Sequence, residues 1–408
     1  MDGDNSDSKH IIGLMLLISA AFVGTTGFRL AIPFIAYLLR EDLGAAMTHI
    51  ALMGTGFMLA RALSSIIFGA IIEKYGRVLL FIVIGMSLNA LVINMYAHIS
   101  SWVEAVILRT LQGFLGGMSW PLIQLVTALA SPTNIRGRIL SLYFALGSLG
   151  IFAGNAIYAL IYYVPIDKGL LLSSLIFSSA IILVIIGIRI LGFSYYPGLK
   201  LRSPKRGLYG KCKESHILSL SVFTGGFAVT YGSAIIFGGI AYIYLYEVFS
   251  TPKPIAALIL GITGMIGIFS SLILGWIADK KSEVLAVNIP LMLMVLAPII
   301  FLFKNTILLI MGIVFVSIAL RAYMPLSRRI IATHTEQPAL GIGEINAIMN
   351  LGTSIGQIVF GVSYDVIKPL TYSMFTVEVV LPPIVLLLAS PLALASMIML
   401  RKSMSNFQ

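Results

Sequence analysis

The stretch Gly69-Ala70-Ile71-Ile72-Glu73-Lys74-Tyr75-Gly76-Arg77 closes a long apolar run with a short charged turn. A related stretch, Gly275-x-x-x-Asp279-Lys280, closes another apolar run 206 residues later, about half of the 408-residue chain. Two more pairs have nearly the same offset: Phe22-x-x-Thr25-x-Gly27 with Phe227-x-x-Thr230-x-Gly232, and Leu146-Gly147-x-x-Gly150 with the one-residue-longer Leu351-Gly352-x-x-x-Gly356. Three pairs at nearly the same offset indicate an internal repeat, so we predict two similar halves.

The composition is that of a membrane protein. Hydrophobic residues make up 59% of the chain and charged residues 11%, whereas soluble domains have roughly 45–50% and 25%. This excludes a disordered protein and an ordinary cytosolic enzyme. The single cysteine, Cys212, excludes a disulfide scaffold and fits no metal-binding pattern.

Twelve apolar runs are long enough to cross a hydrocarbon core of ~30 Å. They lie near residues 11–38, 47–72, 78–97, 102–130, 137–162, 169–193, 217–246, 254–278, 284–303, 306–327, 341–364 and 373–400. We therefore predict an all-α membrane protein with twelve transmembrane helices. The first run is too long for a signal peptide and lacks a cleavage site, so we expect it to be retained.

A polar stretch rich in proline and glycine, residues 194–216, separates two sets of six runs. We predict an N-terminal six-helix bundle over residues 1–193, a cytoplasmic basic linker over 194–216 and a C-terminal six-helix bundle over 217–408. Two parallel repeats joined in this way are typical of transporters that rock around a site between their halves.

The net charge of +11 is an orientation signal. If the N-terminus is inside, eighteen of the 27 lysines and arginines fall on the cytoplasmic side and five in outer loops; four lie within runs. The positive-inside rule then predicts a multi-pass protein of the cell membrane with both termini in the cytoplasm. Nucleic-acid binding explains this distribution poorly.

Two motifs resemble those of the major facilitator superfamily. The segment Gly69–Arg77 is similar to its loop motif G-x-x-x-D/E-R/K-x-G-R-R/K, from which Val78 departs, and Arg109-Thr110-Leu111-Gln112-Gly113 is similar to its R-x-x-Q-G element. Span number, linker and repeat agree with that family over essentially the whole chain. The resemblance implies two six-helix bundles that give alternating access to a central site.

The loop motif implies a gate. Its residues in this chain are Gly69, Glu73, Lys74, Gly76 and Arg77, with Gly275, Asp279 and Lys280 as their counterparts in the second half. We expect the small residue Gly69 to let two helices approach closely. By resemblance, Glu73 contacts the start of the eleventh span and Asp279 the start of the fifth. The alternative is that these charges only set orientation.

Four arginines inside apolar runs are candidate functional residues: Arg29, Arg61, Arg109 and Arg321. An arginine at mid-membrane costs about 2.5–3.5 kcal/mol, so it should face protein or water. Arg109 lies ~12 Å deep in the fourth run and shares a face with Gln112, Gly113, Gly116 and Gly117. An internal structural ion pair is the alternative for Arg109, and snorkelling to the interface is the alternative for Arg29 and Arg321.

No carboxylate falls clearly at mid-membrane, so the arginines should give a positive potential that prefers anions. The predicted substrate and coupling residues are Arg109, Gln112, Arg61, Arg29 and Arg321, with Glu104 as the nearest proton carrier. The alternative for Glu104 is an exposed acid at a helix end.

The leading interpretation is a proton-coupled secondary transporter of a small anion. A proton-driven multidrug exporter is the runner-up, although Ile151 stands where antiporters of the family usually have proline. A transporter-like sensor is a third reading. The chain has no recognisable catalytic constellation, so we expect no enzyme, cofactor or metal. The expected partners are a small-molecule substrate, protons and the lipid bilayer, and we expect a monomer.

Overall fold

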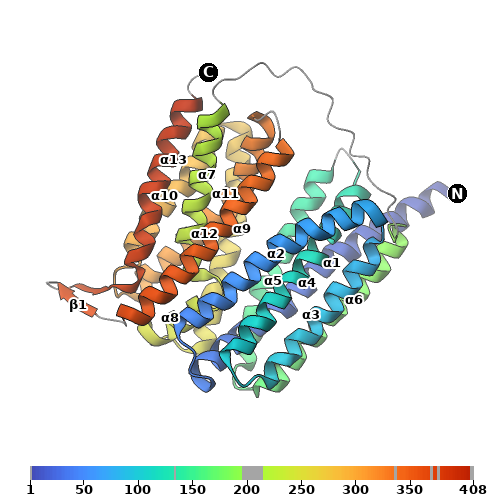
Figure 1. The fold of residues 1–408 in the computed structure, drawn as a ribbon. Helices are drawn as coiled ribbons and strands as arrows, with labels where there is room; N and C mark the ends of the chain where they lie inside the picture. The colour runs from blue at the N-terminus through green and yellow to red at the C-terminus, as the bar shows by residue number, and fades with distance from the viewer. Residues whose placement is uncertain are drawn as a thin grey trace. The chain divides into compact units, whose positions relative to one another are not determined.

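The computed structural model describes residues 2–132, 135–194, 215–334, 338–367, 371–374 and 377–404, and these are almost entirely helical (Figure 1). The helices are α1 (Asp2–Tyr37), α2 (Met47–Tyr75), α3 (Val78–Met95), α4 (Trp102–Ala130), α5 (Arg136–Ile161), α6 (Ile166–Ile190), α7 (Ser215–Gly232), α8 (Ile240–Phe249), α9 (Lys253–Lys280), α10 (Glu283–Ile300), α11 (Thr306–His334), α12 (Pro338–Ile367) and α13 (Ala389–Met404).

Eleven helical segments of the described chain are long and apolar enough to cross a membrane. They coincide with the predicted runs except the seventh, whose place is taken by α7 and α8. The helices therefore occupy the twelve positions that hydropathy predicts.

The seventh run was expected as one helix over 217–246, and that expectation is wrong. Helix α7 ends at Gly232, a short 3-10 turn follows at Ala234–Ile236, and α8 begins at Ile240. Gly238 and Gly239 have φ angles of +66° and +97°, in the left-handed region that a right-handed helix excludes. The two glycines therefore redirect the chain between the two helices.

The twelfth run was expected as a helix from residue 373, and its beginning is also wrong. Strands β1 (Thr371–Met374) and β2 (Val377–Val380) pair in antiparallel fashion, with Thr371 opposite Val380. A 3-10 helix over Pro382–Leu388 follows before α13. The β-branched Val377, Val379 and Val380 favour a strand. The helical segment begins at Pro382 and Pro383, which a first turn tolerates because the N–H groups there have no partner within the helix.

The chain forms two compact units. Unit 1 comprises Met1–Gly44, Gly56–Ser203 and Lys253–Gly261, and unit 2 comprises Ala45–Thr55, Pro204–Pro252 and Ile262–Gln408. In unit 1, α1 packs against α5 and α6, and α3 packs against α4 and α6. In unit 2, α7 packs against α12 and α13, and α10 packs against α11 and α13 (Figure 1). The domain boundaries inferred from the sequence stay a prediction.

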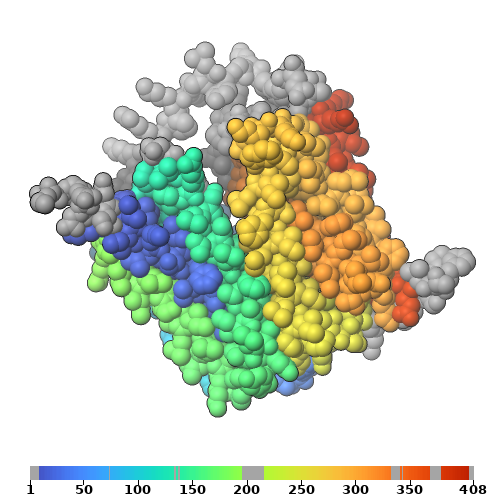
Figure 2. Space-filling view, turned by 180° about the vertical axis from the view of Figure 1, so that it is seen from behind, coloured from blue at the N-terminus to red at the C-terminus, as the bar shows by residue number. Residues whose placement is uncertain are grey.

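Large apolar side chains remain exposed on the outside of the helices. Leu63 and Ile66 of α2 are 59% and 73% exposed, which water would penalise and lipid would not. Figure 2 shows α9 (yellow) along one face, and its exposed side chains include Phe269, Ile273 and Trp276. These surfaces suit a protein embedded in acyl chains.

Candidate functional site

Arg109 is enclosed in unit 1 by aromatic rings. Its side chain is 5% exposed, and its guanidinium carbon lies 4.8 Å from the ring centre of Phe28 on α1 and 4.5 Å from that of Phe57 on α2. Arginine is attracted to the negative face of an aromatic ring, and more strongly where water is excluded. Helix α4 therefore places this cation inside the protein, as its insertion cost predicts.

Gln112 connects Arg109 to two other buried polar groups. Its Oε1 accepts hydrogen bonds from Nη1 of Arg109 at 2.9 Å and from the hydroxyl of Tyr96 at 3.0 Å. Its Nε2 donates to Oδ1 of Asn89 on α3 at 3.1 Å. Because such a network is fully desolvated, each member fixes the orientation of the others. Gln112 thus orients Arg109, and the R-x-x-Q spacing places both on one face of α4.

Arg29 and Arg61 lie in the same unit as Arg109 and are half-buried. Arg29 lies within electrostatic range of both Arg61 and Arg109, and Arg61 and Arg109 both lie against the ring of Phe57. Arg61 also lies 5.9 Å from the ring centre of Phe57, and its charge interacts with Tyr143 of α5. Three of the four predicted arginines therefore form one group, which we call the arginine cluster (Arg29, Arg61 and Arg109).

Two glycines of α4 bring its backbone against α2. A Cβ on Gly113 would overlap the carbonyl oxygen of Phe57, and a Cβ on Gly117 would overlap that of Arg61. Gly116, on the same helix, would meet only a carbon of Trp120 at 3.8 Å. The predicted tight packing of this stripe is confirmed at Gly113 and Gly117, and it positions Phe57 beside Arg109.

Sequence reasoning missed the neighbours that hold the cluster: Phe28, Phe57, Asn89 and Tyr96. Asn89 carried a signal, because an amide in the middle of a strongly apolar run needs a buried partner. Phe28 and Phe57 carried none, since phenylalanine is common in every span.

Arg321 lies on α11 in unit 2. A Cβ on Gly267 of α9 would lie 2.7 Å from Cδ of Arg321, so the aliphatic part of this side chain crosses a glycine. The structure therefore gives Arg321 a packed position between α11 and α9. Its role in binding a substrate stays a prediction.

Glu104 lies in the first turn of α4 and closes that helix end. Its carboxylate accepts hydrogen bonds from the backbone N–H and the hydroxyl of Ser100 and from the hydroxyl of Ser101, each at 3.0 Å. The backbone N–H of Glu104 in turn donates to Oγ of Ser101 at 3.4 Å. This arrangement is a variant of the capping box, in which Glu104 accepts from the N–H of Ser100, one residue before the N-cap Ser101. Glu104 therefore has a local structural role.

The loop motif of the first half ends α2. Gly76 has a φ of +67° and its N–H donates to the carbonyl of Ile72 at 2.8 Å, which is the usual way for glycine to terminate a helix. Lys74 lies 5.1 Å from the ring centre of Tyr75, and Arg77 is exposed. The side chain of Glu73 lies outside the described residues, so its gate role stays a prediction.

The close helix approach between the halves expected at Gly69 stays a prediction. A Cβ on Gly69, or on its repeat counterpart Gly275, would meet no atom within 4 Å. The close approaches of unit 1 occur at positions such as Gly113 and Gly117.

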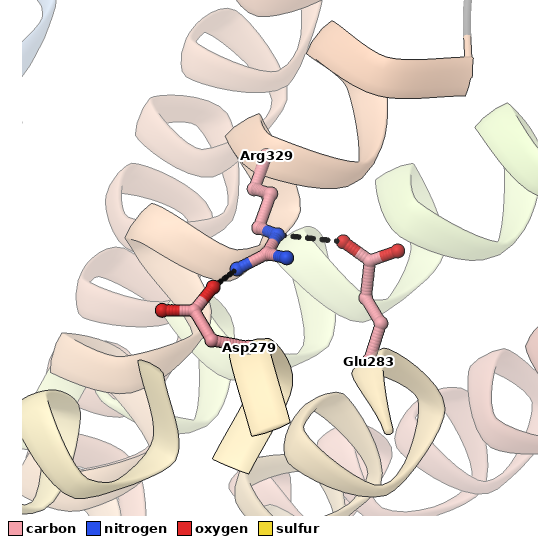
Figure 3. A network of polar contacts seen from close by, with 3 residues as sticks. All are labelled: Asp279, Glu283 and Arg329. Carbon is pink, nitrogen blue, oxygen red and sulfur yellow. Dashed lines mark hydrogen bonds and ion pairs between the residues drawn. The ribbon is translucent and has the colours of Figure 1, made fainter. Parts of the chain in front are cut away.

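Asp279 belongs to an ion-pair network within unit 2 (Figure 3). Nη1 of Arg329 on α11 binds the carboxylate of Asp279 at the end of α9, and Nε of Arg329 lies 3.2 Å from that of Glu283 in α10. Arg329 thereby fastens the turn between α9 and α10 to α11, although the exposed Asp279 limits the strength of the pair. Lys280 ends α9 and is exposed. A contact of Asp279 with the start of the fifth span stays a prediction.

Comparison with known proteins agrees with this architecture. The model of the Major Facilitator Superfamily matches residues 17–361, and no curated protein sequence matches the chain. Among solved structures, a point mutant of the nucleoside transporter NupG has a TM-score of 0.71 at 13% identity, with 97% of this chain and 100% of that chain covered.

A second solved structure, a bacterial homologue of the human lysosomal transporter Spinster in an inward-facing, unoccupied conformation, has a TM-score of 0.63 at 14% identity. The match covers 97% of this chain and 93% of that one. At such identities the likeness shows the fold alone. The predicted all-α fold with twelve transmembrane helices is confirmed.

Proposed function

Because the chain belongs to the Major Facilitator Superfamily, we propose that it is a secondary active transporter that moves a small anionic solute by alternating access. The observation that supports the anion is the arginine cluster. Arg29 lies within electrostatic reach of both Arg61 and Arg109, and Arg61 and Arg109 share the ring of Phe57, in a unit whose helices are apolar enough to span a membrane.

The described contacts of Arg109 are with neutral groups. Gln112 accepts one hydrogen bond and two phenylalanine rings cover the guanidinium, so these contacts hold the cation without cancelling its charge. Like charges in a medium of low dielectric constant raise one another's energy, and an anion placed among them relieves that repulsion. The cluster therefore favours a negatively charged solute.

The three arginines differ in accessibility. Arg109 is nearly inaccessible, whereas Arg29 and Arg61 are half-buried. We therefore propose that Arg29 and Arg61 contact the solute and that Arg109, held by Gln112 and the two rings, sets the local potential. We further propose that the protein is a monomer in the cell membrane, with both termini in the cytoplasm and protons as the coupling ion.

Uptake into proteoliposomes tests the substrate class. We expect accumulation of at least one labelled organic or inorganic anion from a panel of monocarboxylates, dicarboxylates, phosphate and phosphate esters, and its abolition by a protonophore. Organic cations and uncharged nucleosides are the matched controls. Selective uptake of a cation or of a nucleoside would show that the arginine cluster does not select the solute.

Replacing Glu104 by glutamine should leave proton-driven uptake intact. The substitution removes a charge from the start of α4, so we expect a slightly lower thermal stability because the capping box is weakened. The measurement compares anion uptake driven by an imposed pH gradient in the wild type and in Glu104→Gln. Uptake that no longer responds to the gradient would restore Glu104 as the proton carrier.

A further inference from the structure

The start of α2 is held by a carboxylate from a distant part of the sequence. Oδ1 of Asp365, near the end of α12, accepts a hydrogen bond from the N–H of Met47 at 2.9 Å. Its Oδ2 accepts from the N–H of Thr48 at 2.7 Å and from the hydroxyl of Thr48 at 2.6 Å. All three residues belong to unit 2, whereas α2 belongs to unit 1 from Gly56 onward. Asp365 therefore holds one end of a helix that both units share.

The sequence before α2 provides no permanent local cap. The first N–H groups of any helix lack partners within the helix, and serine, threonine, aspartate or asparagine usually supplies one just before it. Here Ala45 and Ala46 precede Met47, and neither has a side-chain oxygen. A charge-assisted bond from Asp365 satisfies these donors, and its negative charge suits the positive end of the helix dipole. Such a cap can be removed without any change within α2.

A buried amide without hydrogen-bond partners among the described residues destabilises the packing of the start of α2 against α12. Gln357, on α12, is 0% exposed, and within the described chain neither Oε1 nor Nε2 of its amide has a hydrogen-bond partner. The hydroxyl of Ser354, one turn earlier, is in the same situation. Buried polar groups without partners raise the free energy of the state that buries them. Separation of α2 from α12 would let water reach these atoms.

Glycines allow the amide to be buried in this way. A Cβ on Gly54 of α2 would lie 2.6 Å from Nε2 and 2.7 Å from Oε1 of Gln357, and a Cβ on Gly238 would lie 3.0 Å from Nε2. The amide is thus wedged against two backbones, without room for a ligand. The packed state is stabilised by Asp365 and destabilised by Gln357, as expected of an element with two states of similar free energy.

The start of α9, the repeat counterpart of α2, is also held by a side-chain contact from a distant part of the sequence. Helix α9 begins at Lys253, 206 residues after Met47, and its first residues, Lys253–Gly261, belong to unit 1. There Nζ of Lys253 lies 2.5 Å from the carboxylate of Glu41 and 4.8 Å from the ring centre of Tyr37. Both partners of this ion pair are partly exposed to solvent, which limits its strength.

We propose that Asp365 and the first turn of α2 form a latch, which closes in the state described here and opens once in each transport cycle, with Gln357 setting the balance between the two states. The predicted topology places this end of α2 on the outer side. The proposal rests on the alternating access proposed above.

Alkylation of a single buried cysteine tests the latch. Thr55 lies on α2 with Oγ1 3.3 Å from the carbonyl of Ser354, and Thr55→Cys in a Cys212→Ser background is a nearly isosteric probe. The rate of reaction with a water-soluble maleimide is measured on the full-length protein in lipid nanodiscs without substrate. Asp365→Asn keeps the size of the side chain but replaces an acceptor by an amide donor, and we expect about tenfold faster alkylation.

Two further variants should change the alkylation rate in opposite directions. Gln357→Leu removes the unpaired amide and should slow alkylation about tenfold, whereas Thr48→Val removes one of the three bonds to Asp365 and should accelerate it about threefold. Gly343→Ala is the matched control on α12, because a Cβ there would meet nothing within 4 Å. If Asp365→Asn does not yield folded protein, Thr48→Val and Gln357→Leu still decide the outcome.

The results separate the latch from the proposed function. Equal alkylation rates in the wild type and the variants, together with active anion uptake, would overturn the latch and leave the function standing. The expected changes in rate, in a protein that accumulates no anion, would support the latch and contradict the proposed substrate.

Discussion

Replacing Arg109 by glutamine should lower the rate of anion uptake about 100-fold. The substitution removes a positive charge that raises the potential at the solute, and a charge about 5 Å away contributes about 3 kcal/mol at an effective dielectric constant of about 20. Since 1.36 kcal/mol corresponds to a tenfold change, this loss amounts to about 100-fold. The substitution also leaves Arg29 and Arg61 with a weaker positive potential. The measurement is the initial rate of uptake into proteoliposomes that contain equal amounts of folded protein.

Lysine at position 109 should not restore uptake. A planar guanidinium can present both faces to Phe28 and Phe57 while donating sideways to Gln112, whereas an ammonium group is a compact charge that favours hydration. Arg189→Gln is the matched control, since it removes the same charge from an exposed position in the last turn of α6. Wild-type uptake by Arg109→Lys would show that only the charge matters and that the aromatic enclosure is incidental.

Hydropathy predicted the spans because insertion into lipid depends on a sum over about twenty residues, which a single sequence contains. It failed where local backbone geometry overrides that sum. The run over 217–246 is apolar throughout, yet Gly238 and Gly239 take positive φ angles and divide it. The run over 373–400 begins in the hairpin of β1 and β2, where Val377, Val379 and Val380 favour a strand, and its helical part begins only at Pro382. In both cases the backbone preference of a few residues decides the local structure, and hydropathy averaged over about twenty residues does not show it.

The charged residues of the candidate site could be predicted from the sequence, but the residues that surround them could not. A buried arginine is costly wherever it lies in a span, so Arg29, Arg61 and Arg109 stood out without any knowledge of their neighbours. The rings that cover Arg109 come from α1 and α2, and their identity depends on how those helices pack against α4. Asp365 illustrates the same limit, because its partners lie 317 and 318 residues away in the sequence.

The glycine stripe of α4 shows that a glycine motif is ambiguous. Gly113 and Gly117 permit a close approach of α4 to α2 within unit 1, whereas a Cβ on Gly116, in the same stripe, would meet only a carbon of Trp120 at 3.8 Å. A small residue at a given spacing reports that a large side chain is absent, and only the packed structure shows whether another backbone fills the space.

Alanine at Gly113 should destabilise the protein far more than alanine at Gly116. The added Cβ at position 113 would overlap the carbonyl oxygen of Phe57 and lie 2.8 Å from its carbonyl carbon and Cα. These are backbone atoms of α2, which cannot rotate away, so α2 and α4 must separate. Overpacking of this kind costs about 1–3 kcal/mol. Reversible unfolding in mixed micelles, followed by the loss of helical circular dichroism, measures the difference.

Gly116→Ala is the matched control, because it makes the same chemical change one turn along the same helix. A Cβ there meets only a carbon of Trp120 at 3.8 Å, and alanine is favoured over glycine within a helix by about 0.5–1 kcal/mol. We therefore expect Gly116→Ala to equal or exceed the wild type in stability and to transport normally. Gly113→Ala should also lose uptake, because moving Phe57 uncovers one face of Arg109. Equal stability of the two variants would mean that α2 and α4 are not in backbone contact at this point, and the enclosure of Arg109 would then need another explanation.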